Sequence, residues 1–197
     1  MCRQSSYTDN LCCRENALPW KDIGMYLVSV YFDKKTNKIL QRYIDKIASV
    51  TGNDFMTANH VPPHLTISSI EARSADVLLP AFESLQGRVS SGEIQFVSVG
   101  QLLPYVIFAT PVLDEYLLDL SKSVYDAFSA IPETSISRYY RPLSWLPHVT
   151  LGKKLDKVQL QQAFEVMQNN FAPFTAKVVE MGLAKVNPHE DVMRYYL

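Results

Sequence analysis

The 197-residue sequence has few cysteines, and they are confined to one end of the chain. Cys2, Cys12 and Cys13 all fall within the first thirteen residues, and the remainder has none. A disulfide framework needs cysteines distributed through the domain. We therefore expect no structural disulfides, and we interpret Cys12 and Cys13 as reduced thiols in a polar N-terminal extension over residues 1–20.

Long apolar runs are also missing. The richest stretch, 102–113, is interrupted by Pro104 and Pro111, whereas a transmembrane helix needs about 20 consecutive apolar residues. The opening segment, 1–16, lacks the apolar run of about 7–15 residues that is typical of a signal peptide. These absences predict a soluble cytoplasmic protein with no membrane partner.

Strong net charge and the glycine motifs of nucleotide-binding loops are absent as well. The formal net charge is -1 and the isoelectric point is about 6.4, which excludes a protein that coats DNA or RNA through bulk electrostatics. No Gly-x-x-x-x-Gly-Lys loop and no Gly-x-Ser-x-Gly elbow occurs. His60 and His64 have the spacing of zinc ligands on a helix, but Pro62 and Pro63 exclude a helix there. We expect no metal and no cofactor.

The sequence does contain an order of elements that occurs twice. A hydrophobic content of 47% suits a single domain over residues 21–197, and each half has the periodicity of strand, helix, strand, helix, strand. The expected elements are 25–32, 36–48, 63–70, 77–85 and 94–99 in half 1 (about 24–103), and 105–110, 113–128, 146–151, 156–167 and 174–186 in half 2 (about 104–190). Such an internal duplication predicts an α+β fold with two lobes related by a pseudo-twofold axis. Antiparallel-rich sheets would surround a central cleft, with helices on the outer faces.

One five-residue pattern lies at the same place in both halves. Pro63-His64-Leu65-Thr66-Ile67 returns 84 residues later as Pro147-His148-Val149-Thr150-Leu151. Residues two apart in a strand share a face, so each histidine lies beside a threonine while the aliphatic neighbours point to the core. A pseudo-twofold axis would make the two histidines partners in one site.

Two such histidines suit the chemistry of a phosphodiester. An ordinary imidazole pKa near 6.5 allows both protonation states at neutral pH. A neutral imidazole accepts a proton from water or a ribose hydroxyl, and an imidazolium protonates the departing oxygen. Hydroxyl groups stabilise the charge on the phosphoryl oxygens. We therefore predict His64 and His148 as the acid and base pair, with Thr66 and Thr150 as hydrogen-bond donors to phosphate.

Cations and aromatic residues interleave just before the second motif, at Arg138, Tyr139 and Arg141. This mixture suits a nucleotide, because arginine pairs with phosphate and aromatic rings stack on bases. The alternative is an exposed loop whose aromatics pack on the body. Lys153, just beyond the motif strand, is a candidate phosphate ligand, although a solvated surface lysine has the same pattern. Tyr105 is a further candidate for substrate binding.

The two motifs resemble those of the 2H phosphoesterase superfamily, which contains 2',5'-RNA ligases and 2',3'-cyclic nucleotide phosphodiesterases. The second motif, running from His148 to Lys153, is similar to the family pattern, with lysine where an arginine is common. The first departs from it, because Ser68-Ser69-Ile70 stands where an aromatic residue, leucine and glycine often occur. Over residues 23–186 the resemblance implies a bilobal, metal-independent enzyme in which His64 and His148 are the acid and base. The motif threonines would bind the non-bridging phosphate oxygens.

The predicted function is therefore a metal-independent hydrolase in RNA processing. Its substrate would be a 2',3'-cyclic phosphate or 2',5'-phosphodiester at an RNA end or in a small nucleotide. Two alternatives stay open: a nucleotide or RNA-end binding module with little turnover, and the reverse reaction, 2',5'-RNA ligation. Two matched proton-transferring groups favour catalysis, because binding alone requires neither.

Overall fold

The structure is a computed structural model that describes residues 23–60, 62–132, 134–186 and 189–197. The predicted extension over 1–20, with Cys2, Cys12 and Cys13, lies outside the described residues. The first half contains β1 (Gly24–Phe32), α1 (Lys34–Thr51), α2 (Phe55–Ala58), β2 (His64–Ala72), a 3-10 turn (Ala75–Val77), α3 (Leu79–Glu83) and β3 (Gly92–Leu102). The second half contains β4 (Val106–Pro111), α4 (Glu115–Ser129), β5 (Ser135–Ile136), a 3-10 turn (Arg138–Tyr140), β6 (Val149–Gly152), α5 (Lys157–Asn170), β7 (Phe174–Val186) and β8 (Glu190–Tyr196).

The three long helices begin at aspartates. The side chains of Asp33, Asp114 and Asp156 accept hydrogen bonds from backbone N–H groups in the first turns of α1, α4 and α5. A carboxylate at this position satisfies donors that have no partner within the helix. Helix α1 ends at Gly52, whose φ of 69° is favourable only for glycine and a few polar residues. The caps of α1 explain why it extends beyond the expected range of 36–48, and Asp114 explains why α4 begins at Glu115 and not at 113.

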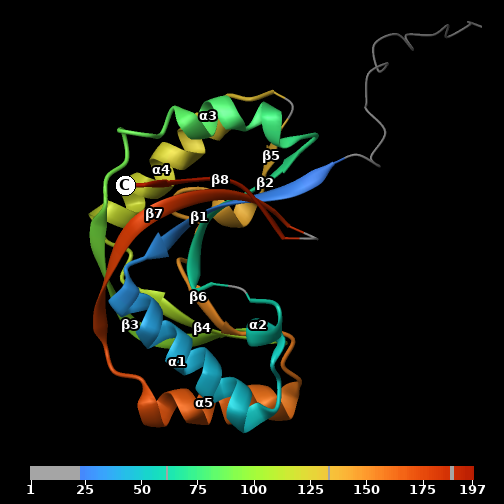
Figure 1. The fold of residues 1–197 in the computed structure, drawn as a ribbon, viewed down its shortest axis with the longest axis vertical. Coiled ribbons are helices and arrows are strands. Elements are labelled where there is room, and N and C mark those ends of the chain that lie inside the picture. The colour runs from blue at the N-terminus through green and yellow to red at the C-terminus, as the bar shows by residue number, and fades with distance from the viewer. Residues whose placement is uncertain (1–22, 61, 133, 187–188) are drawn as a thin grey trace, which may run out of the picture.

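The strands form one antiparallel sheet in the order β5-β2-β1-β7-β3-β4-β6, with β8 paired to β7. Strand β7 joins the two lobes, since one part of it pairs with β1 and β8 and the beginning pairs with β3. Figure 1 shows this sheet bent into a C shape, with helices on its outside. The α+β class with two lobes, an antiparallel sheet and outer helices is confirmed.

The two halves exchange helices. Helix α1 of the first half contacts α5 and β6 of the second, whereas α4 of the second half contacts β2, β3 and α3 of the first. The apolar face of each helix is therefore buried against the opposite half, and Leu40, Ile44 and Ile47 of α1 are almost fully buried there. Buried residues of both halves therefore belong to one hydrophobic core.

Some elements differ from the sequence expectation. The expected helix over 77–85 is shorter, because Pro80 lies in the first turn of α3 and a 3-10 turn precedes it. Strand β8 was not expected, since its residues are only partly buried and show little alternation. Strand β6 begins at Val149, so His148 lies immediately before the strand rather than within it. None of the described helices is long and apolar enough to span a membrane.

Candidate active site

The strands that carry the two motifs lie next to each other although they are far apart in the strand order. Strands β2 and β6 contact one another without pairing, because the sheet curls until they meet (Figure 1). The buried Trp145, three residues before His148, donates a hydrogen bond from Nε1 to the carbonyl oxygen of Thr66 at 3.1 Å. A direct hydrogen bond therefore connects the segment of the second motif to the strand of the first.

The two imidazoles are held by the same local bond. Nδ1 of His64 lies 2.8 Å from the carbonyl oxygen of Pro62, and Nδ1 of His148 lies 2.8 Å from that of Leu146. A proline separates the residues in each pair, and it restricts the preceding residue to extended conformations. Since a carbonyl can only accept, Nδ1 carries the hydrogen in both rings. Each Nε2 is left to accept or donate a proton.

The electrostatic surroundings of the two rings differ. Burial lowers the pKa of His64 below its usual value, the bond to Pro62 opposes this, and the positive charges of His189, His148 and Arg194 lower it further. Burial also lowers the pKa of His148, against the effect of its bond to a carbonyl. Both imidazoles therefore favour the neutral form, and a positive charge on His148 strengthens this preference at His64.

The motif threonines have different neighbours. Thr66 is buried, and its Oγ1 lies 3.4 Å from Oγ of Ser29 on β1, which can donate to it. Its own hydroxyl hydrogen can then be given to another acceptor. Thr150 is half-buried on β6, opposite Phe108 of β4. Both positions are compatible with a hydroxyl that donates to a phosphate oxygen.

Each motif strand contains an extra residue directly after the threonine. The residue is Ile67 in β2 and Leu151 in β6, where the pairing register shifts. An extra residue reverses the alternation of side chains between the two faces. Ser69 therefore shares the face of Thr66, and Lys153, just beyond β6, follows in phase with Thr150. The two halves differ at these equivalent positions, one neutral and one cationic.

The other predicted binding residues lie at two places. Arg138, Tyr139 and Arg141 are exposed beside β2, where the N–H of Ser137 bonds to the carbonyl of Ser69. Arg138 stacks 4.8 Å from the ring of Tyr139 and donates to its hydroxyl. Within the same segment Tyr140 and Trp145 pack into the core, so the alternative of aromatics packed on the body holds for these two.

Tyr105 and Lys153 lie at the opposite end of β6. Both are exposed, and the carbonyl of Tyr105 accepts a hydrogen bond from the N–H of Leu155 at 3.1 Å. The predicted site residues thus form one group beside each motif strand.

Sequence reasoning missed several residues around the histidines. The ring of Tyr31 on β1 lies 6.2 Å from that of His64, and the ring of Phe108 on β4 lies 5.2 Å from that of His148. Arg194 on β8 stacks on Tyr31 at 4.0 Å. In β1, Ser29 and Tyr31 alternate with buried valines, and this pattern could have indicated from the sequence that both side chains share the face next to the first motif. The sequence of β8 contains no comparable pattern that would have indicated Arg194.

His60 and His189, the histidines outside the motifs, are both exposed. His60 has a φ of 50° in the turn before β2 and lies in no helix. His189 contacts Asp191 at 3.4 Å. In the described part of the chain, no three histidine, cysteine or acidic side chains gather as they would around a metal ion.

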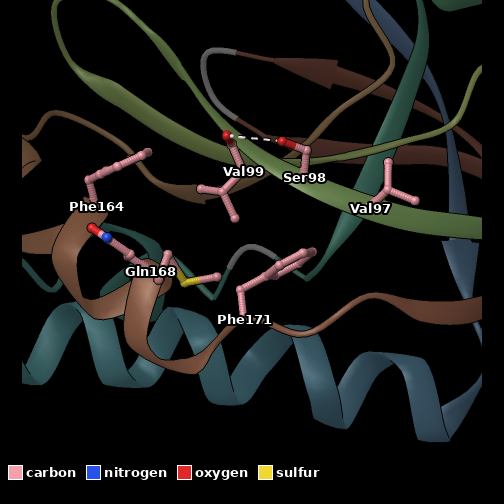
Figure 2. Close-up of a pocket in the computed structure, with 7 residues that line it drawn as sticks. Val97, Ser98, Val99, Phe164, Gln168 and Phe171 are labelled. Carbon is pink, nitrogen blue, oxygen red and sulfur yellow. Dashed lines mark hydrogen bonds between the residues drawn. The ribbon is translucent and has the colours of Figure 1, made fainter.

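A hollow of about 400 Å³ lies elsewhere, between β3 and α5. Figure 2 shows Phe164, Gln168 and Phe171 on one side and Val97 to Val99 on the other. None of the predicted site residues lines it. The hollow is therefore separate from the histidine motifs.

Comparisons with known proteins agree with this geometry. A model of the 2'-5' RNA ligase superfamily matches residues 38–190, whereas a comparison with curated proteins finds no match. Similar solved structures include E. coli LigT complexed with 3'-AMP (TM-score 0.54, 15% identity) and in apo form (0.52, 15%). Each alignment covers 89% of this chain and 98% of LigT. The fold is that of LigT, and the chain belongs to the 2'-5' RNA ligase superfamily, a group of 2H phosphoesterases.

Proposed function

We propose that this protein is a metal-independent phosphodiesterase that uses His64 and His148 as a general acid and base pair. Its substrate would be a 2',3'-cyclic phosphate or a 2',5'-phosphodiester of an RNA end or a small nucleotide. The observation that carries the proposal is the matched bond from each Nδ1 to a carbonyl. It leaves both Nε2 atoms available for proton transfer from equivalent positions.

The proposed hydrolysis of a cyclic phosphate conserves atoms and protons. Nε2 of one neutral histidine takes a proton from water while the water oxygen forms a bond to phosphorus. The bond from phosphorus to one ribose oxygen breaks, and that oxygen takes a proton from the imidazolium of the other histidine. Thr66 and Thr150 donate hydrogen bonds to the non-bridging oxygens as their negative charge increases. Proton exchange with solvent then restores both histidines.

The remaining candidates complete the substrate site. Lys153 and Tyr105 at one end of β6, and Arg138, Tyr139 and Arg141 beside β2, would contact the flanking parts of a nucleotide. E. coli LigT has been crystallised with 3'-AMP, which makes a nucleoside phosphate the natural first ligand to test with this chain. The partner would thus be a nucleotide or an RNA end.

Phosphorus NMR tests the proposal with a 2',3'-cyclic mononucleotide, a 2',5'-linked dinucleotide and an RNA ending in a cyclic phosphate. Turnover should persist after EDTA treatment. His64→Ala and His148→Ala should each lower it by about 10² to 10⁴, and the double variant by much less than the product of the two. His60→Asn is the matched control, since His60 is exposed and has a φ of 50° that asparagine tolerates.

Three results would contradict the proposal. Saturable binding without product would indicate a binding module, and joining of RNA ends without hydrolysis would indicate a ligase. Wild-type turnover in either single alanine variant would exclude the two-histidine mechanism.

A further inference from the structure

A row of residues connects the first motif to the C-terminal strand. Thr66 of β2 pairs with Ser29 of β1, Ser29 pairs with Gly182 of β7, and Gly182 pairs with Arg194 of β8. Directly opposite residues lie on the same face of a sheet. We call the face that carries His64 and Thr66 the histidine face. Arg194 belongs to it, although 130 positions separate it from His64.

Arg194 is held close to His64 by an aromatic ring. Its guanidinium carbon lies 4.0 Å from the centroid of Tyr31, and that centroid lies 6.2 Å from the centroid of the His64 ring. Gly182 makes this possible, because a Cβ there would lie 2.9 Å from Tyr31 Cε2 and 3.1 Å from Arg194 Cγ. The absence of a side chain in the middle of the sheet leaves room for the stacked pair.

The guanidinium is oriented but not enclosed. Nη2 donates to Oδ1 of Asp191 at 2.8 Å, and about a quarter of the Arg194 side chain is exposed. Burial opposes its charge, but the bond to Asp191 and the charges of Tyr31, Asp191 and Glu180 raise the pKa of Arg194 overall. Nε is buried and has no hydrogen-bond partner among the described residues. A buried donor without a partner costs stability, so packing alone gives little reason for an arginine here.

Within the described residues, the second lobe has no equivalent cation stacked on the aromatic ring beside its histidine. The ring next to His148 is Phe108, and no lysine or arginine of the described residues stacks on it. The two ends of a substrate lying between the histidines would therefore meet different surfaces. Among the described residues, the ring beside His64 therefore has a cation stacked on it, and the ring beside His148 does not.

We propose that Arg194 binds a second phosphate of the substrate, on the His64 side of the phosphate that reacts. The inference rests on the proposed function, because it assumes that the reacting phosphate lies between His64 and His148. A planar guanidinium held by one carboxylate still presents donors in the geometry that phosphate oxygens accept. Asp191 and Glu180 offset its charge, so directed hydrogen bonds rather than a general positive field provide the selectivity. The second phosphate is either the 5'-phosphate of a mononucleotide or the internucleotide phosphate of an RNA end.

Calorimetric binding tests this without requiring turnover. The ligands are adenosine 3'-monophosphate, adenosine 3',5'-bisphosphate and the 3'-phosphorylated dinucleotide ApAp, at constant ionic strength because charge interactions are screened by salt. We compare the wild type with Arg194→Met, which keeps the apolar stem on Tyr31, and with Arg194→Lys, which keeps the charge. Arg42→Met is the matched control, because Arg42 also stacks on a tyrosine, Tyr43 at 5.9 Å, but lies exposed on the outer helix α1.

The wild type and Arg42→Met should bind at least one doubly phosphorylated ligand about tenfold more tightly than the monophosphate, the scale of one charge-assisted hydrogen bond. Arg194→Met should lose this preference and keep the affinity for the monophosphate, while Arg194→Lys should keep part of the preference. Preference for the bisphosphate identifies a 5'-phosphate, and preference for ApAp identifies the internucleotide phosphate. Equal wild-type affinities with normal hydrolysis would overturn the role of Arg194 alone. An equal loss for all ligands in Arg194→Met would also overturn it. Absence of both binding and hydrolysis would refute the proposed function itself.

Discussion

Trp145→Phe is the substitution that best tests how the two motifs are held together. The indole Nε1 donates to the carbonyl of Thr66 at 3.1 Å, and the side chain is only 6% exposed. Phenylalanine keeps an aromatic ring in the same position but has no donor. Removing one partner of a buried hydrogen bond costs about 1–3 kcal/mol, and we expect a loss of unfolding free energy in this range.

The effect on activity should exceed the effect on stability. Trp145 lies three residues before His148, and the segment between them is also held by the Thr110 hydroxyl, which donates to the carbonyl of Pro147 at 2.8 Å. Loss of the bond to Thr66 removes a direct hydrogen bond between the two motifs, so the distance between the histidines is less restricted. A displacement of about 1 Å in a reacting group can lower a rate about 10²-fold. We expect kcat for a cyclic phosphate to decrease by about tenfold to hundredfold.

Urea unfolding and steady-state hydrolysis measure the two effects on the same preparations. The matched control is Tyr116→Phe, which removes a hydroxyl that donates to the carbonyl of Ser90 at 3.0 Å, far from the motif strands in the sequence. It should lose stability with unchanged kcat. If Trp145→Phe loses stability but keeps wild-type kcat, the bond between the motifs has no role in catalysis.

Three further predictions follow from the site. Catalysis needs one neutral and one protonated histidine, and the pKa values of His64 and His148 are both lowered. We therefore expect kcat/KM to be maximal below about pH 6.5. A maximum at alkaline pH would contradict this prediction. The unfolded chain binds protons more readily at these residues, so the free energy of unfolding should fall as the pH drops below about 6.5, by at most about 1.4 kcal/mol per pH unit for each histidine. Urea titrations should show that the unfolding free energy of His64→Gln depends less on pH than that of the wild type. An unchanged pH dependence would be inconsistent with the lowered pKa of His64. Gly182→Ala should reduce the unfolding free energy by about 1–3 kcal/mol, because its Cβ would press on Tyr31 and Arg194. Wild-type stability in Gly182→Ala would show that Tyr31 and Arg194 accommodate the added methyl group without a loss of stability.

The sequence was sufficient for the order of the ten expected helices and strands and for the contents of each motif. The helix of α1 followed from an apolar stripe that the structure buries, and the strand of β7 from a run with the predicted limits of 174 and 186. These signals are local, since they depend on residues a few positions apart. The match between the two halves then indicated which strands were equivalent.

The helix exchange could not be predicted in this way. An amphipathic pattern shows that one face of α1 is buried, but it does not show whether the partner is the sheet of its own half or that of the other. Strand β8 was missed for a related reason. Its sequence, with Asp191 and Arg194 among partly buried residues, is stabilised by pairing with β7, a contact that a local pattern does not contain.

The sequence by itself determined that a histidine stands two residues before a threonine in each motif. It also placed a proline before each histidine, which is a local constraint on the backbone. Only the tertiary structure decided that the two strands meet, and that Tyr31 and Arg194 surround one histidine while Phe108 lies beside the other. Neighbours across a sheet are set by strand register and sheet curvature, which depend on the packing of the whole chain.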